Sequence, residues 1–93
     1  MHGKVSDVTG MVINTDSLKL VHRPLTAGAE IAPHSHPGME VCFFLLSGRV
    51  DVCLDGEEHH ILVGPQALSF DGQHEISARA EEVSEAVVCL RKA

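Results

Sequence analysis

Short β-type runs, separated by turn residues, occupy most of this 93-residue chain, and no amphipathic helix of any length lies between them. Most of the runs are rich in Val, Ile, Leu or Phe and end at Gly, Pro, Asn or Asp. The ranges are 9–13, 18–25, 29–32, 40–46, 50–54, 59–63, 67–70, 74–79 and 83–90. Short strands with turns every few residues predict an all-β fold, either a sandwich or a barrel of antiparallel strands.

Two segments refine this prediction. Asp55-Gly56 is a strong two-residue hairpin signal, and it joins the runs 50–54 and 59–63. The segment 80–88 has apolar residues at three- and four-residue spacing, so a short helix is an alternative there. Because an open sheet would leave long apolar edges unprotected, we expect the barrel to close or the edges to pair between subunits.

Size and charge limit the classes of partner. A chain this short has a thin core, so a second subunit or a metal would supplement its stability, and we expect a homodimer. The net charge of −6 argues against nucleic acid and anionic membranes as partners. The longest apolar run, 41–46, is too short to cross a bilayer, and no secretory signal begins the sequence. Three cysteines without a tight pair favour the reducing cytoplasm.

Histidines and a glutamate gather in the segment 33–40, Pro-His-Ser-His-Pro-Gly-Met-Glu. Residues two apart in an extended chain face the same side, so His34 and His36 present both imidazoles to one space. A turn at Pro37-Gly38 would let Glu40 point back at that space from the next strand, with Cys42 facing the same interior. Two imidazoles and a carboxylate suit a first-row divalent metal. The alternative is a polar turn with solvated histidines.

A fourth ligand would come from elsewhere in the barrel. The best candidate is His74, which follows a turn at Asp71-Gly72 and begins a strand. Other histidines have simpler explanations: His59 and His60 are adjacent, so they face opposite sides of a strand, and His22 fits a surface or interface position.

The same residues resemble the motifs of the cupin superfamily. The first motif is Gly, five residues, His-x-His, three residues, Glu, six residues and Gly, and here it spans 28–48 with seven residues between Glu40 and Gly48. The second spans 64–78 and has one residue instead of two before His74. The resemblance implies a cupin-type jelly-roll β-barrel of short antiparallel strands, with residues 1–93 as one cupin domain.

The resemblance also implies a metal site. In this family three histidines and one glutamate hold manganese, iron, nickel or zinc, with open positions for water or substrate. The matching residues here are His34, His36, Glu40 and His74. We therefore expect one divalent transition metal and a small-molecule ligand or substrate.

Three functions remain open at this point. The chain could be a metal-dependent oxygenase, isomerase or lyase, a metal-bound cupin that binds or senses a small ligand without catalysis, or a structural cupin. Tyrosine is absent, which removes one general acid or base, and no catalytic residue or organic-cofactor site is assigned. A carboxylate ligand could be held by one of Arg23, Arg49 and Arg79.

The cysteines leave alternatives as well. Cys42 is either a small buried hydrophobe or a thiol close to the metal. Cys53 and Cys89 lie on predicted strands with nothing nearby in the sequence to activate them.

Overall fold

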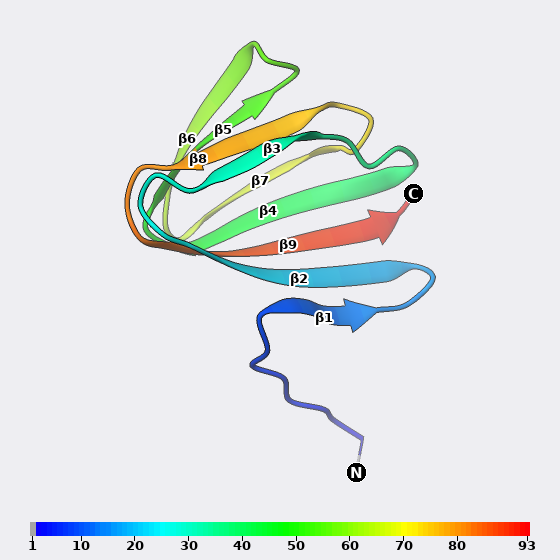
Figure 1. Ribbon diagram of the computed structural model, residues 1–93. Coiled ribbons are helices and arrows are strands. Elements are labelled where there is room, and N and C mark those ends of the chain that lie inside the picture. Colours follow the sequence, from blue (N-terminus) through cyan, green and yellow to red (C-terminus); the bar gives the residue numbers. More distant parts are fainter. Residues whose placement is uncertain (1) are drawn as a thin grey trace.

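The computed structural model describes residues 2–93 and contains, within that range, nine strands and no helix (Figure 1). The all-β prediction is confirmed, and the helical alternative for 80–88 is wrong because β8 and β9 occupy this region. No helix in the described range could span a membrane. The strands are β1 (Gly10–Asn14), β2 (Leu18–Leu25), β3 (Glu30–His34), β4 (Met39–Ser47), β5 (Arg49–Leu54), β6 (Glu58–Val63), β7 (Gln66–Asp71), β8 (Ile76–Ala80) and β9 (Ser84–Lys92).

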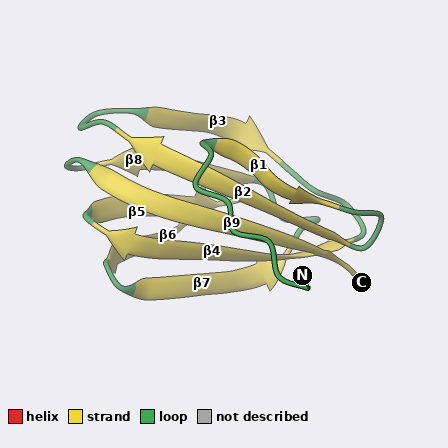
Figure 2. Cartoon of the chain, turned by 90° about the horizontal axis from the view of Figure 1, so that it is seen from below, coloured by secondary structure: helices red, strands yellow, loops and turns green. Residues whose placement is uncertain are grey.

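Two antiparallel sheets form the two layers of the molecule. One has the strand order β1-β2-β9-β4-β7 and the other β3-β8-β5-β6. Figure 1 shows the larger sheet below the smaller one, and Figure 2 shows the larger sheet from beneath, with β9 between β2 and β4. The amphipathic alternation of the strands explains this arrangement, because each sheet buries one apolar face against the other.

Alternate residues of the central strands make the core. Phe43 and Leu45 on β4, Val50 and Val52 on β5, and Ala86 on β9 are all fully buried. Complete burial of a side chain such as Phe43 stabilises a fold by about 2–3 kcal/mol. The core therefore fixes which residues of β4 point inward.

The facing predicted for β4 is wrong. Glu40, Phe44 and Leu46 are exposed on the outer face, whereas Val41 and the core residues of this strand point inward. The reason lies at the end of β4, where the pairing with β9 is irregular between Leu45 and Ser47. This irregularity accommodates one extra residue and reverses the side to which every preceding residue points.

The β5–β6 hairpin also differs from its prediction by one residue. Asp55 and Gly56 both have positive φ angles, 55° and 70°, as a tight turn at these positions requires. Glu57 then lies between the turn and β6, so Leu54 pairs with Glu58. Because of this extra residue, Cys53 lies directly opposite His59.

Candidate functional site

A small hollow lies between the two sheets. It measures about 110 Å³, and its walls are mostly apolar side chains of both sheets. Its polar lining residues are Arg23, His34 and His36. Apolar walls with a few polar groups are typical of small-molecule sites. The apolar lining residues are Val21, Ile31, Val41, Phe43, Ile76, Val88 and Leu90.

The two predicted histidines lie together at this hollow. Their ring centroids are 4.8 Å apart, and the rings meet edge to face at 88°. His34 ends β3, and its Nδ1 lies 2.8 Å from the carbonyl oxygen of Ala32. Because a carbonyl can only accept, this Nδ1 is the donor, and the neutral tautomer of His34 with this contact has its lone pair on Nε2.

Backbone contacts hold His36 in place. Its N–H donates to the carbonyl of Gly72 at 2.7 Å, and the N–H of Gly72 donates to the carbonyl of Met39 at 2.8 Å. A side chain at Gly72 would collide with the carbonyl oxygen of His36, so only glycine permits this approach. The predicted turn at Pro37-Gly38 is present, with Gly38 at a φ of 79°.

Burial lowers the pKa of His36 below its ordinary value of 6.5, and the neighbouring His34 and Lys19 lower it further. The imidazole of His36 is therefore neutral over a wider pH range than that of a free histidine. Neutral imidazole is the form that binds metal ions and accepts hydrogen bonds.

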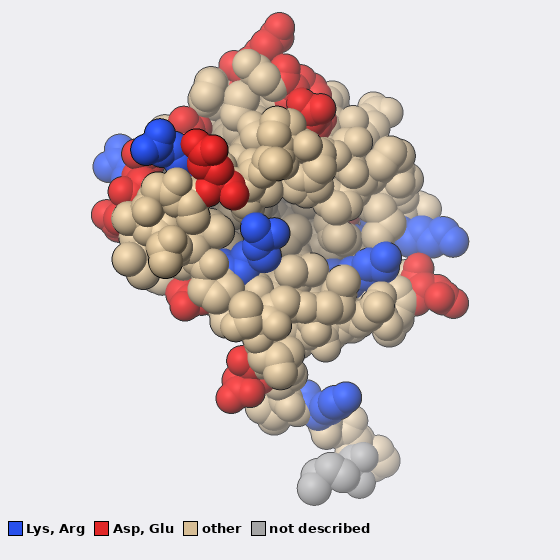
Figure 3. Space-filling model, viewed as in Figure 1, with Lys and Arg blue, Asp and Glu red and all other residues tan. Residues whose placement is uncertain are grey.

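Arg23 adds a positive charge to the same hollow. It projects inward from β2 and is half-buried. None of the ion pairs formed by residues 2–93 includes Arg23. Figure 3 shows basic side chains beside the recess in the middle of this face and acidic ones toward the end of the β5–β6 hairpin. The hollow thus suits a ligand with an acidic group.

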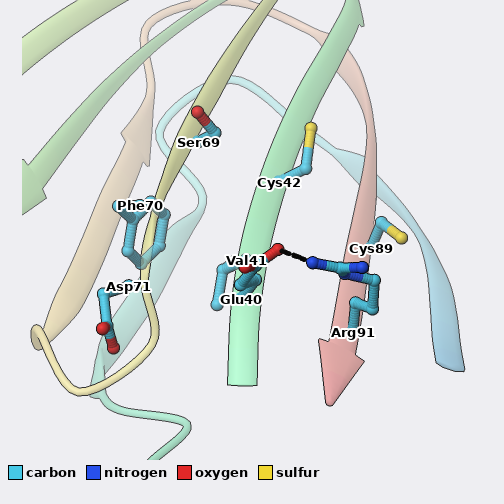
Figure 4. Close-up of a pocket in the computed structure, with 8 residues that line it drawn as sticks. All are labelled: Glu40, Val41, Cys42, Ser69, Phe70, Asp71, Cys89 and Arg91. Carbon is cyan, nitrogen blue, oxygen red and sulfur yellow. Dashed lines mark hydrogen bonds and ion pairs between the residues drawn. The ribbon is translucent and has the colours of Figure 1, made fainter. Parts of the chain in front are cut away.

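Glu40 lies on the opposite face of β4 from the two histidines. Its Oε2 accepts hydrogen bonds from Nε and Nη2 of Arg91 at 3.1 and 2.6 Å (Figure 4). Both side chains border an outer hollow of about 460 Å³. The motif has six residues between its glutamate and its glycine, and the residue separated from Gly48 by six residues is Val41, which faces the inner hollow. The sequence already indicated that Glu40 is displaced by one position, because seven residues rather than six separate it from Gly48.

His74 also lies apart from the histidine pair. Its Nδ1 is 2.7 Å from Oδ2 of Asp55, and both residues border another hollow beside the β5–β6 turn. The backbone N–H of Glu75 and the imidazole of His74 lower the pKa of Asp55. The structure therefore brings together two of the four predicted ligands. Among residues 2–93, no group of three or more His, Cys, Asp or Glu side chains is arranged to hold a metal ion.

Cys42 does not lie beside the histidines. It shares the outer hollow with Glu40 and pairs across the strands with Cys89 (Figure 4). Burial and the nearby Cys89 raise the pKa of the Cys42 thiol. Cys42 is therefore a partly buried thiol on the outer side of β4, and it does not line the hollow that contains the two histidines.

Comparison with known proteins identifies the fold. The cupin domain family matches residues 22–88. The SPY1581 protein from Streptococcus pyogenes has a TM-score of 0.84 at 21% identity, covering 100% of this chain and 90% of that one. KdgF from Halomonas sp. has a TM-score of 0.79 at 24% identity, covering 89% and 76%.

Ectoine synthase from P. lautus has a TM-score of 0.70 at 16% identity, and the match covers 83% of this chain and 55% of that one. A search of curated proteins found no match. Identities this low show the fold alone. The family match over residues 22–88, more than half of the chain, shows that this chain belongs to the cupin family.

Proposed function

We propose that this cupin binds a small, largely apolar molecule with an acidic group in the hollow between its sheets. The observation that carries the proposal is the convergence of Arg23, His34 and His36 on a hollow whose other walls are apolar. The guanidinium would pair with the acidic group, while the apolar walls would bury the rest of the ligand. At about 110 Å³ the hollow limits the ligand to a few non-hydrogen atoms.

The proposal includes one divalent transition metal, manganese, iron, nickel or zinc, held by His34 and His36. Support comes from the free Nε2 lone pair of His34 and the lowered pKa of His36, which keeps that ring neutral. Glu40 and His74 of the predicted set have other partners, Arg91 and Asp55, so the remaining coordination positions would go to water or the ligand. A bound metal would supply Lewis-acid polarisation of a ligand oxygen.

Ligand binding without catalysis is favoured over an enzyme by the lining of the hollow. No carboxylate is among its lining residues within the described part of the chain, so a general acid or base other than the histidines is missing there. The name of ectoine synthase indicates that one fold relative is an enzyme. Catalysis by this chain as an oxygenase, isomerase or lyase would need a proton-transfer group from the ligand or the metal-bound water.

Assembly as a homodimer in the cytoplasm is also part of the proposal. The outer face of the larger sheet carries the exposed apolar side chains of Phe44 and Leu46, which a second copy could cover. The free thiols of Cys42 and Cys89 lie opposite each other, an arrangement that suits a reducing compartment. Sedimentation at micromolar concentration should show a dimer, and a monomer would remove this element of the proposal.

The test of the metal site is a calorimetric titration with Ni²⁺ beside elemental analysis of protein prepared without tag or chelator. We expect about one metal ion per chain in the parent and none in His34→Ala/His36→Ala. The matched control is His59→Ala/His60→Ala, which removes two histidines elsewhere and should leave metal binding unchanged. Equal loss in both double variants, or no binding by the parent, would refute the metal element.

The test of the anionic ligand uses short-chain monocarboxylates, from acetate to hexanoate, as probes. Arg23→Gln should weaken binding by about tenfold to a hundredfold, since a charge-assisted hydrogen bond contributes about 1.5–3 kcal/mol. Arg49→Gln is the control, because Arg49 does not line this hollow. The absence of binding by any probe, or equal loss in both variants, would contradict the assignment of Arg23.

A further inference from the structure

A second cluster of polar side chains lies on the outer face of the smaller sheet and consists of Cys53, His59 and Asp51. None of the three lines the hollow that contains Arg23, His34 and His36. Cys53 and His59 are direct partners across β5 and β6, and Asp51 is two residues before Cys53 on the same face. The Cys53 Sγ lies 3.6 Å from Nε2 of His59. The other ring nitrogen of His59, Nδ1, lies 3.0 and 3.3 Å from the two carboxylate oxygens of Asp51.

This order of groups is that of an activated nucleophile. A carboxylate that accepts from Nδ1–H fixes the tautomer in which Nε2 has a lone pair, and that nitrogen faces the thiol. Nε2 of His59 can therefore take the Cys53 proton. These three residues are not arranged as a metal site, because no group of three or more His, Cys, Asp or Glu side chains among residues 2–93 could hold a metal ion.

A hollow of about 370 Å³ lies beside the cluster. It extends from β3 across β8 to β6, and its lining includes all three cluster residues with Ser77 and Arg79. Cys53 is only 9% exposed, and the exposed part of the residue borders this hollow. None of the ion pairs among residues 2–93 involves Arg79, and its charge is free for an anion.

We propose that Cys53 is a nucleophilic thiol, with His59 as its base and Asp51 as the residue that positions His59. The 370 Å³ hollow beside these residues takes a small carbon electrophile whose carboxylate is held by Arg79. In the reaction an S–C bond forms at the electrophilic carbon. The thiol proton passes to Nε2 of His59, and the leaving group departs with the electron pair of the broken bond. With iodoacetate as the probe, the leaving group is iodide and the product is a thioether.

The other two thiols provide an internal comparison. Cys42 and Cys89 face each other without a histidine partner among the described residues, and the pKa of Cys42 is raised. The proposal therefore predicts faster alkylation of Cys53, although Cys53 is more buried than either of them.

The experiment measures alkylation of the intact, folded protein at pH 7, quenched at intervals and digested with trypsin. The sequence places Cys42, Cys53 and Cys89 in separate tryptic peptides, 20–49, 50–79 and 80–91. Mass spectrometry then gives the three rates from one sample. We expect Cys53 to react with iodoacetate about tenfold faster than Cys42 or more, and His59→Gln to remove this advantage. His60→Gln is the matched control and should change nothing.

Arg79 and Asp51 have their own readouts. Arg79→Gln should slow iodoacetate several-fold and leave neutral iodoacetamide unchanged, with fragment ions locating the label because one cleavage site is lost. Asp51→Asn should slow Cys53 at pH 7 and have little effect near pH 10, where hydroxide removes the thiol proton without help. If Asp51 had only a structural role, Asp51→Asn would slow the alkylation of Cys53 equally at both pH values.

Several outcomes would overturn the proposal. Cys53 could label only after denaturation, label no faster than Cys42, or keep its rate in His59→Gln. Should His59→Gln fail to fold by far-ultraviolet circular dichroism, addition of free imidazole to His59→Ala provides a second test. Restoration of the Cys53 rate supports the base assignment, and its absence in folded His59→Ala contradicts it.

Discussion

Two groups of histidine in this cupin differ in their partners. The inner pair, His34 and His36, lies at the hollow between the sheets and contacts no carboxylate among the described residues. The second group, named the outer group because its members lie outside that hollow, consists of four imidazoles that each pair with a carboxylate: His22 with Glu85, His59 with Asp51, His60 with Glu58 and His74 with Asp55.

The difference shows what decides the chemistry of a histidine. Glu85, by accepting a hydrogen bond, raises the pKa of His22, with a smaller effect from the Val8 carbonyl. Burial and a neighbouring imidazole lower the pKa of His36. A carboxylate partner therefore favours proton binding and an apolar hollow favours the free lone pair, although the residue type is the same.

The largest expected effect comes from giving the inner pair the carboxylate that it lacks. Val41 faces the hollow and is 2% exposed, so Val41→Glu should raise Ni²⁺ affinity about tenfold or more by supplying a third ligand. Without metal the buried charge should lower the free energy of unfolding by about 3 kcal/mol. Calorimetry and denaturation with and without Ni²⁺ measure both effects.

Val41→Gln is the control for Val41→Glu, because it adds the same volume without the charge. Equal Ni²⁺ affinity in the two variants would show that position 41 does not reach a metal at His34 and His36. That result would also mean that the lack of a carboxylate partner is not what limits metal binding by the inner pair.

A second prediction concerns the backbone contact that fixes the inner pair. Gly72→Ala places a methyl group against the carbonyl of His36, so it should lower the free energy of unfolding by about 1–3 kcal/mol and displace the His36 ring. Gly3→Ala is the control, since Gly3 has no neighbour within 4 Å of an added Cβ. Denaturation curves and the His36 NMR signal measure the change. Equal curves for the two variants would contradict the close approach.

A third prediction contrasts the two groups by pH. In an NMR titration, His22 should titrate above 6.5 and His36 below it. Stability from the His22–Glu85 pair is complete below pH 6.5 and is lost as pH rises through the folded-state pKa of His22. For His36, the unfolded chain binds the proton more readily, so stability falls as pH drops below 6.5.

The control for this titration is Glu85→Gln, which should bring the His22 midpoint down toward 6.5 and leave His36 where it is. Ni²⁺ affinity should fall as the pH drops through the His36 midpoint, because a protonated ring has no lone pair for the metal. If His36 titrated above His22, then neither the carboxylate partner of His22 nor the burial of His36 would control their pKa values as described.

Much of the fold was predictable from the sequence because it depends on local rules. Alternating apolar residues and turn residues indicated every strand, and His34 and His36 converge because they are two residues apart between prolines. The predictions that were wrong, the facing of β4 and the pairing of β5 with β6, depend on register shifts of a single residue. One extra residue near the end of β4 turned Glu40 outward, and Glu57 placed Cys53 opposite His59.

His74 illustrates a different limit of sequence reasoning. The turn that precedes it was predicted correctly, and the N–H of His74 donates to the carbonyl of Asp71 at 3.1 Å. The direction of its side chain is set by Asp55, nineteen residues away in the chain. This carboxylate comes within reach only because the fold places the turn of the β5–β6 hairpin beside the segment that joins β7 to β8.

The smallest expected effect is that of replacing Glu40. This variant distinguishes a metal site that includes Glu40, as the sequence predicts, from one that His34 and His36 hold without it. Glu40→Gln should change Ni²⁺ affinity less than twofold, because the side chain lies on the outer face and pairs with Arg91. Loss of this exposed ion pair should lower the free energy of unfolding by about 1 kcal/mol at most. Arg91→Gln should give the same small loss of stability. If Glu40→Gln abolished Ni²⁺ binding while Arg91→Gln did not, Glu40 would be a ligand, and β4 would have to turn its other face to the hollow when the metal binds.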